Sequence, residues 1–339
     1  MTLAAIFGLA GPSVSDEERR FFQDADPLGF ILFARNIENG PQVTALTAEL
    51  RSLVSQVDAP VLIDQEGGRV QRLRSPEWRE APAAAVFGQL ALRDLPASRR
   101  AVYLNHRLLA DELVALGITV DCAPVVDLRH ERAHDVIGDR AFGADPDLVA
   151  ELGRAACEGL ADGGVQPIIK HIPGHGRGLV DSHLELPVCD ASEVTLVESD
   201  FVPFRLLRDR AWAMTAHVVY SAVDPDLPAT TSPTVMQQVI RGSLGFDGVV
   251  VSDDLSMQAL SGSLADRAAA AMAAGCDLAL HCNGDLSEMQ AVASAVGEPT
   301  PETWTRLQEA SLRVGPAEPL SSARRSHILA ELESYLQLA

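Results

Sequence analysis

The chain has 339 residues, 47% of them hydrophobic and only 5% aromatic, so it can bury a large core built mainly from Ala, Leu and Val. Its formal net charge of −20 argues against nucleic acids or anionic membranes as partners. No run approaches the roughly 18 apolar residues of a membrane span, so we expect no membrane association.

The cysteines and the N-terminus both favour a cytoplasmic protein. Five cysteines are spread along the chain without any CxxC pair, which is typical of a reducing compartment. The first twenty residues hold a short apolar run with no basic segment before it, and we interpret this run as a strand and not as a signal peptide. We also expect a monomer.

Eight short apolar runs alternate with helical patterns along the chain. The runs cover residues 4–10, 29–34, 60–66, 118–124, 165–171, 212–218, 248–254 and 277–282. Helical patterns cover residues 42–56, 98–116, 145–163, 234–242 and 262–275. Apolar strands that alternate with helices indicate a parallel sheet with both faces covered. Eight of them predict an α/β fold of the (β/α)₈ barrel type.

We expect residues 1–339 to form a single catalytic barrel domain, with residues 300–339 as a helical C-terminal tail packed on its outside. An open, doubly wound sheet is the alternative, but no GxGxxG motif follows a strand.

Polar residues gather at the ends of the predicted strands, where the loops of a barrel converge on one mouth. These residues are Asp64, Asp121, Lys170, His171, His217, Asp253, Asp254 and His281. Catalytic groups of barrel enzymes lie at this face, so the pattern predicts an active site there.

The stretch "VVVSDDLSM" ends the seventh run with two adjacent aspartates. Neighbouring side chains on a strand point to opposite faces, so only one of Asp253 and Asp254 can face the barrel axis. The other is expected to cap the following helix. An N-cap beside a surface charge is the non-catalytic alternative for the pair.

Two loops carry arginines that could bind a polyhydroxylated ligand. In "VLIDQEGGRVQRLRSP", Asp64 precedes a Gly-Gly turn, and Arg69, Arg72 and Arg74 follow. Carboxylates and guanidinium groups can together hold several sugar hydroxyls through charge-assisted hydrogen bonds. Arg140 lies in the glycine-flanked "VIGDRAF". A surface ion pair and a solvated loop charge are the alternatives for the two loops.

The loop "KHIPGHGRGLVDSH", from Lys170 to His183, follows the fifth run. Lys170 is the only lysine among 27 basic residues, which suggests a role that arginine cannot fill. Asp181 and His183 share one side of an extended segment, and a carboxylate beside an imidazole makes a general acid/base. A metal site that includes His171, His175 and His183 is an alternative, although Pro173 and Gly174 argue against the helix that zincin-type HxxxH spacing requires.

Several motifs in this order resemble family 3 of the glycoside hydrolases, and within it the β-N-acetylglucosaminidases of the NagZ type. They are "GFILFARNI", "LIDQEGGRVQRL", "CAPVVDL", "VIGDRAFG", "KHIPGHG" with "DSH", "MTAHVVYSAVDPDLPATTSP" and "LGFDGVVVSDDLSM". The resemblance covers residues 5–285, and its one departure is Ile172, where the family usually has phenylalanine.

The resemblance implies a role for each matching residue. Asp253 would be the nucleophile, His183 the general acid/base and Asp181 the partner of His183. The terminal N-acetylglucosamine would be held by Asp64, Arg72, Arg140, Lys170 and His171. No metal and no cofactor would be needed.

The resemblance also implies the reaction. The expected enzyme is a retaining exo-β-N-acetylglucosaminidase (a β-N-acetylhexosaminidase) that acts on muropeptide fragments of peptidoglycan during cell-wall recycling. A histidine acid adds no negative charge near the incoming acceptor, so a phosphorylase that uses phosphate is the close alternative. A metal-dependent hydrolase and a barrel that binds sugar without catalysis are the others.

The glycines of the same loop suggest motion. Gly174, Gly176 and Gly178 permit backbone angles closed to other residues, and the segment from Ile172 to Ser182 is longer than a usual βα loop. We therefore expect a lid that carries Asp181 and His183 while Lys170 stays fixed. A loop that stays packed, with its glycines in tight turns, is the alternative.

Overall fold

The computed structural model of the chain describes residues 1–130, 134–178, 180–182 and 184–338. Eight strands pair in parallel in the order β10-β1-β2-β3-β4-β5-β7-β9. A bridge between Val251 and Leu278 joins the first and last strands of this order, so the sheet closes on itself. The predicted (β/α)₈ barrel is confirmed.

The barrel strands match the eight predicted runs. They are β1 (Leu3–Phe7), β2 (Pro27–Leu32), β3 (Val61–Ile63), β4 (Val120–Asp121), β5 (Gln166–Ile172), β7 (Trp212–Thr215), β9 (Val249–Val251) and β10 (Ala279–His281). Every residue of β2 and β5 is buried, because the helices cover the outside of the sheet while side chains fill its interior.

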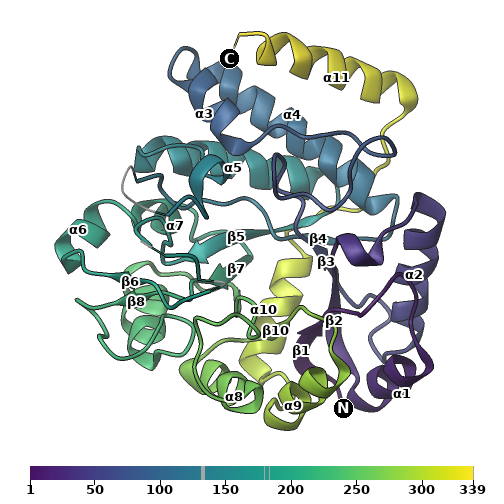
Figure 1. The fold of residues 1–339 in the computed structure, drawn as a ribbon. Coiled ribbons are helices and arrows are strands. Elements are labelled where there is room, and N and C mark those ends of the chain that lie inside the picture. The colour runs from purple at the N-terminus through teal and green to yellow at the C-terminus, as the bar shows by residue number, and fades with distance from the viewer. Residues whose placement is uncertain (131–133, 179, 183, 339) are drawn as a thin grey trace.

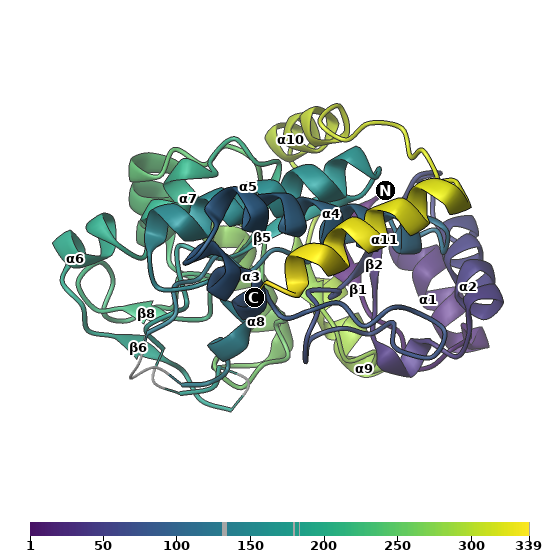
Figure 2. The same ribbon diagram turned by 90° about the horizontal axis from the view of Figure 1, so that it is seen from above.

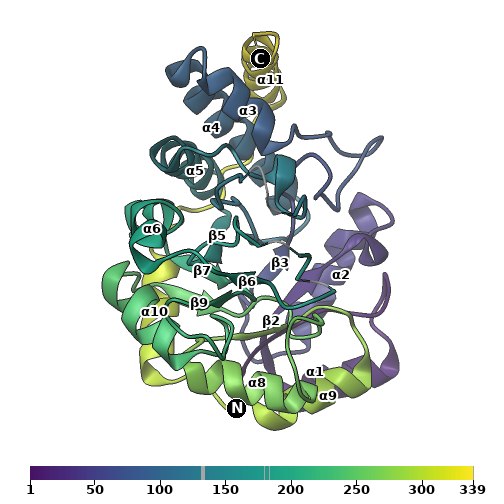
Figure 3. The same ribbon diagram turned by 60° about the vertical axis from the view of Figure 1, so that its left-hand side comes forward.

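Helices surround the strands (Figures 1 and 3). They are α1 (Asp16–Ala25), α2 (Gly40–Ser52), α3 (Ala84–Ala91), α4 (Leu95–Val114), α5 (Pro146–Asp162), α6 (Glu193–Glu198), α7 (Val202–Leu206), α8 (Leu264–Ala274), α9 (Leu286–Ala295), α10 (Pro301–Ser311) and α11 (Ser322–Leu336). Short 3₁₀ turns cover Ala34–Asn36 and Gly138–Arg140.

Local sequence signals explain where many of the helices begin. Ser15 and Ser263 each accept a hydrogen bond from the backbone three residues on, and Glu18 and Asp266 return the bond in a capping box. Proline stands in the first turn of α2, α4 and α5, where the missing N–H has no helical partner to lose.

Some elements differ from the expected ones. The segment expected as a helix at 234–242 forms a π-helix over Val235–Ser243. Two short strands, β6 (Val188–Cys189) and β8 (Val219–Tyr220), pair with each other outside the barrel. Each has only two residues, which is too short for a readable apolar pattern.

The C-terminal segment contains the helices α10 and α11. Helix α10 packs beside β9, and α11 lies across α4 on the outer surface (Figure 2). Ion pairs join α11 to the barrel, including Arg100 with Glu331 at 2.8 Å and Arg325 with Glu112 at 2.8 Å. Helix α11 is therefore held on the outside of α4.

Candidate active site

A cavity of 260 Å³ lies at the carboxyl ends of the barrel strands. Its polar and charged lining residues are Asp64, Glu66, Arg72, Arg140, Lys170, His171, His175, Ser182, Asp253 and Asp254. Six of the residues predicted from the sequence thus line the cavity: Asp64, Arg72, Arg140, Lys170, His171 and Asp253. Such a volume is slightly below the roughly 300–1,000 Å³ of most small-molecule sites, and it suits a single sugar ring.

One side of the cavity is a continuous chain of charged groups. Asp64 accepts from Arg72 Nη2 at 2.9 Å and from Lys170 Nζ at 2.7 Å. Lys170 Nζ also lies 2.7 Å from Glu66 Oε1. The guanidinium of Arg140 then donates to both oxygens of Glu66, at 2.8 Å each. We call these five residues the ion chain.

The ion chain keeps its members charged despite their burial. Burial alone would raise the pKa of Asp64, but Lys170 and Arg72 hold it well below its usual range. Burial would likewise raise the pKa of Glu66, and Arg140 and Lys170 lower it to about 2. For Lys170, burial acts to lower the pKa, and the two carboxylates raise it above its usual value.

The position of Lys170 explains why a lysine stands there. Its ammonium group lies between Asp64 and Glu66 and is almost fully buried. A compact point charge with three donors can serve two carboxylates from a strand end, whereas a planar guanidinium needs more room. Two of its three donors are occupied, so only one remains for a ligand.

Glu66 was not among the predicted site residues. It stands two residues after Asp64, directly before Gly67 and Gly68, whose φ angles of 97° and 57° let the chain turn back. The spacing of two carboxylates before a Gly-Gly turn was the available signal. Its partner Arg140 lies on a different loop, which the sequence did not link to it.

Gln65 and Asp121 hold the turn that carries the two carboxylates. Gln65 Oε1 accepts from the backbone N–H of Arg72 and Leu73, at 2.8 and 3.1 Å. The N–H of Gln65 donates to Asp121 Oδ1 at 3.0 Å. Asp121 is buried within β4 and does not line the cavity. It fixes the backbone of Gln65, between Asp64 and Glu66.

Arg69 and Arg74 do not line the cavity. Arg69 Nη2 donates to the carbonyl oxygens of Asp135, Val136 and Ile137, and its Nε lies 2.9 Å from Asp139. Arg74 donates to backbone carbonyls of its own loop. Of the three arginines after Asp64, only Arg72 belongs to the cavity.

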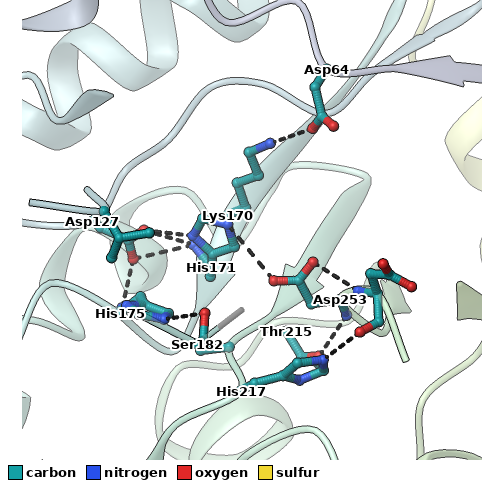
Figure 4. A network of polar contacts seen from close by, with 12 residues as sticks. Asp64, Asp127, Lys170, His171, His175, Ser182, Thr215, His217 and Asp253 are labelled. Atoms are coloured by element: carbon teal, nitrogen blue, oxygen red, sulfur yellow. Dashed lines mark hydrogen bonds and ion pairs between the residues drawn. The ribbon is translucent and has the colours of Figure 1, made fainter. Parts of the chain in front are cut away.

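Asp253 faces the ion chain from the end of β9. Its Oδ1 accepts from the N–H of Asp254 at 2.8 Å, and its Oδ2 lies 4.0 Å from His171 Nε2 (Figure 4). Burial alone would raise the pKa of Asp253, but His171 and His217 lower it below its usual value. The result is an anionic carboxylate on a rigid strand end.

The neighbouring Asp254 has a structural set of bonds. Its carboxylate accepts from the N–H and the hydroxyl of Ser256, at 3.0 and 2.6 Å, and from the N–H of Cys282 at 3.1 Å. It therefore caps a turn and joins the ends of β9 and β10, whereas the sequence predicted a helix cap. The next helix, α8, begins only at Leu264.

Asp127, a second missed residue, orients the histidines of the site. It is fully buried, and its carboxylate accepts from the N–H and the Nδ1 of His171, the latter at 2.7 Å. The same carboxylate accepts from the N–H of His175 at 2.7 Å. Binding at Nδ1 turns Nε2 of His171 toward Asp253 (Figure 4).

The glycines of the loop after β5 serve close packing. A Cβ on Gly176 would lie 2.0 Å from the carbonyl oxygen of Leu128, so no larger residue fits there. The carbonyl of Gly174 accepts from the Tyr220 hydroxyl at 2.6 Å. Gly174 also has a φ of 140°, an angle that other residues rarely adopt, as predicted for these glycines. This part of the loop is buried, and the motion of the loop stays a prediction.

Of the predicted acid/base pair, Asp181 and His183, the structure describes only Asp181. Asp181 is described and does not line the cavity, and its carbonyl accepts from the N–H of Leu184 and of Glu185. His183 lies outside the described residues. Ser182, between them, lines the cavity wall and is 3% exposed.

The sequence profile of the glycosyl hydrolase family 3 N-terminal domain matches residues 5–315. The chain belongs to glycoside hydrolase family 3. It is therefore an enzyme, and the predicted family is confirmed. The cavity described above lies at the face where barrel enzymes carry their catalytic groups, so it is the candidate active site of this family 3 hydrolase.

Curated relatives and solved structures of this glycoside hydrolase agree with that membership. A "Beta-hexosaminidase" from Alkalilimnicola ehrlichii is 42% identical over 342 residues, which cover 93% of this chain and 96% of the relative. A "Beta-hexosaminidase" from Pseudomonas aeruginosa is 40% identical over 289 residues, 84% of each chain. NagZ from Neisseria gonorrhoeae, in complex with N-trifluoroacetyl-D-glucosamine, is 33% identical with a TM-score of 0.87, and the match covers 100% of this chain and 98% of that one.

Two negative findings concern only the described part of the family 3 chain. No group of three or more His, Cys, Asp or Glu residues in it could hold a metal ion. No helix in the same residues is both long and apolar enough to cross a membrane.

Proposed function

We propose that the chain is a retaining exo-β-N-acetylglucosaminidase, which removes β-linked N-acetylglucosamine from the non-reducing end of its substrate. The observation that carries this proposal is the opposition of two features across one cavity of sugar size. The ion chain offers charged donors and acceptors to the hydroxyls of a sugar ring. Asp253 offers an anionic oxygen beside the same space.

The ion chain suits the task of holding one sugar ring accurately. Its groups are fixed by one another before any ligand arrives, so binding requires little reorganisation. The remaining donor of Lys170 and the acceptor sites of Asp64 that the two cations leave free can bind neighbouring hydroxyls. Arg72 and Arg140 complete the set, and both line the cavity.

The proposed reaction has two steps. In the first, Asp253 Oδ2 attacks the anomeric carbon while His183 gives its proton to the glycosidic oxygen; the bond from the carbon to that oxygen breaks and a glycosyl-enzyme forms. In the second, water attacks the anomeric carbon, His183 accepts a proton from the water, and Asp253 leaves as a carboxylate. Asp181 orients His183 and stabilises its protonated form.

The low pKa of Asp253 supports its role as the nucleophile, because a nucleophilic carboxylate must be ionised at neutral pH. His171 supports that role from the side. Asp127 fixes its ring so that Nε2 faces Asp253 at 4.0 Å, close enough to stabilise the carboxylate without blocking it.

The substrate is proposed to be a cytoplasmic peptidoglycan fragment, in which N-acetylglucosamine is joined to an anhydro-muramic acid that bears a peptide. The relatives named β-hexosaminidase and the Neisseria gonorrhoeae protein that binds N-trifluoroacetyl-D-glucosamine support the sugar. The single-ring cavity supports removal of one terminal residue at a time. The role would be cell-wall recycling, carried out by a monomer whose 339 residues form one catalytic domain.

The direct test compares chromogenic 4-nitrophenyl substrates. The β-N-acetylglucosaminide should be cleaved with a kcat/KM at least about 100-fold above that of the β-glucoside, because the acetamide is part of what the site recognises. Added phosphate should leave the rate unchanged, and the only sugar product should be N-acetylglucosamine. A sugar 1-phosphate as the main product would replace this proposal by a phosphorylase, and equal turnover of the β-glucoside would overturn the assigned sugar.

A further inference from the structure

We propose that Ser182, held by His175, is a positioning residue for the acid/base step of the reaction. The proposal rests on the function proposed above, which assigns that step to His183 and its partner Asp181. Ser182 stands between these two residues in the sequence. The contacts that fix Ser182 therefore fix the residue that directly precedes the proposed acid in the sequence.

The side chain of Ser182 contacts His175, one of the two histidines that line the cavity. His175 Nε2 lies 3.2 Å from Ser182 Oγ, and both side chains are buried (Figure 4). His175 is itself anchored through its N–H, which donates to Asp127 Oδ1. Asp127 also binds His171. One buried carboxylate therefore positions both His171, beside the nucleophile, and His175, which holds Ser182.

The backbone of Ser182 has a second attachment, on the nucleophile's side of the cavity. The N–H of Ala259 donates to the carbonyl of Ser182 at 3.3 Å. Ala259 lies in the loop between β9 and α8, six residues after Asp253. Ser182 is thus hydrogen-bonded both to His175 and to the loop that follows Asp253.

The chemistry of the His175 ring indicates which atom donates. His175 Nδ1 has no hydrogen-bond partner among the described residues. A buried N–H without an acceptor is more costly than a bare nitrogen, so we assign the proton to Nε2, which then donates to Ser182 Oγ. Burial and the neighbouring His171 lower the pKa of His175 to about 4, so its ring stays neutral near pH 7 and the bond persists.

Positioning of this kind has a measurable value in catalysis. A general acid must lie within hydrogen-bond reach of the oxygen that it protonates, and a shift of about 1 Å can cost about 100-fold in rate. Ser182 does not supply the proton itself and acts only by placing the residue that does. The loss of Ser182 should therefore matter most for a leaving group that needs a proton.

The test is the variant Ser182→Ala, assayed on two substrates that share N-acetylglucosamine and differ in the leaving group. For the unactivated disaccharide chitobiose, kcat/KM should fall about 10- to 100-fold, with KM little changed. For the 2,4-dinitrophenyl glycoside, whose leaving group needs no proton, it should fall less than about 3-fold. The ratio kcat/KM reports only steps up to glycosylation, so the second step does not enter.

A matched control and a second variant complete the design. Ser221→Ala removes an exposed hydroxyl that donates only to the carbonyl of Cys189, and it should behave as wild type on both substrates. His175→Gln should reproduce the Ser182→Ala pattern, and the double variant should lose no more than the worse single variant, because both remove one interaction.

The results separate this proposal from the one on which it rests. Equal losses of Ser182→Ala on both substrates, or no loss on chitobiose, would overturn the positioning role while His183→Ala still shows the leaving-group dependence of a missing acid. If His183→Ala loses activity equally on both substrates, the proposed acid is wrong and the role of Ser182 falls with it.

Discussion

The two walls of the cavity are held in different ways. On one wall, the ammonium group of Lys170 lies 2.7 Å from a carboxylate oxygen of Asp64 and 2.7 Å from one of Glu66. Arg72 binds Asp64 at one end of this ion chain, and Arg140 binds Glu66 at the other. On the other wall, His175 holds Ser182 through a single contact of 3.2 Å between groups that are neutral near pH 7. The first wall grips the sugar in the proposed function, and the second supports the acid.

The difference suggests a division of labour. Charged groups that neutralise one another are costly to separate, since the loss of one partner leaves a buried charge uncompensated. A neutral hydrogen bond contributes only about 1 kcal/mol. The loss of one member of the ion chain should therefore cost more stability than the loss of the contact between His175 and Ser182.

The largest effect is expected at the nucleophile, which stands between the two walls. Asp253→Ala should lower kcat by about 10⁴-fold or more without unfolding the protein, because no other group can form the glycosyl-enzyme. Steady-state kinetics together with a thermal melt measure both parts of this expectation.

Asp254 offers the matched comparison for that variant. Asp254→Ala removes the bonds to Ser256 and to the N–H of Cys282, so it should lower the melting temperature more than Asp253→Ala does. An active Asp253→Ala enzyme beside an inactive but well-folded Asp254→Ala enzyme would show that the nucleophile had been assigned to the wrong aspartate.

The next effect concerns the ion chain. Glu66→Gln keeps the shape of the side chain but leaves Arg140 and Lys170 with one anion fewer. We expect KM for the β-N-acetylglucosaminide to rise about 30-fold, since hydrogen bonds to charged groups contribute about 2 kcal/mol. The free energy of unfolding should fall by about 3 kcal/mol, as measured by denaturant titration.

An exposed ion pair is the control for Glu66→Gln. Glu331→Gln breaks the contact with Arg100 on the outer surface, far from the cavity, and should cost less than about 1 kcal/mol with KM unchanged. If Glu66→Gln were as mild as this control in both KM and stability, the ion chain would not be what organises the sugar wall.

The last effect is the dependence of stability on pH, which separates the two walls. The pKa of His175 is lowered from 6.5 to about 4, so the unfolded chain binds its proton first and stability falls as pH drops from about 6.5 to 4. This residue alone accounts for about 3 kcal/mol over that range. Glu66, with a pKa lowered to about 2, contributes stability that is present above pH 4.5 and lost only as pH falls from there toward 2.

Denaturant titrations between about pH 7 and pH 3 can resolve these ranges. His175→Gln should flatten the slope between pH 6.5 and 4, and the deficit of Glu66→Gln should stay constant down to about pH 4.5. The same slope in wild type and His175→Gln would mean that burial does not lower the pKa of His175 and that its ring is protonated in the folded protein.

The sequence predicted the barrel because eight short apolar runs alternate with helical patterns, and six of those runs carry a polar residue at or near their ends. It also predicted Asp64, Lys170 and Asp253 as neighbours, since strand ends of a barrel converge. The short pair of β6 and β8 and the π-helix over Val235–Ser243 depend on tertiary packing, which leaves no periodic pattern in so few residues.

The missed site residues have a common cause. Glu66 and Asp127 act through partners that are distant in the sequence: Arg140 for Glu66, and His171 and His175 for Asp127. Their spacing along the chain carries no sign of these contacts, which exist only once the barrel has closed. The packing role of Gly176 was missed for a similar reason, because the close approach of Leu128 to Gly176 is a tertiary contact.

The most direct test of the proposed mechanism is covalent trapping of the nucleophile. A 2-deoxy-2-fluoro glucosyl donor with an activated leaving group should form a stable glycosyl-enzyme, because a retaining mechanism passes through a covalent intermediate. Peptide mass spectrometry should find the sugar on Asp253, and the Asp253→Ala variant should take up no label. A label on another residue, or turnover of the natural substrate by an enzyme that never forms an adduct, would contradict the central role of Asp253.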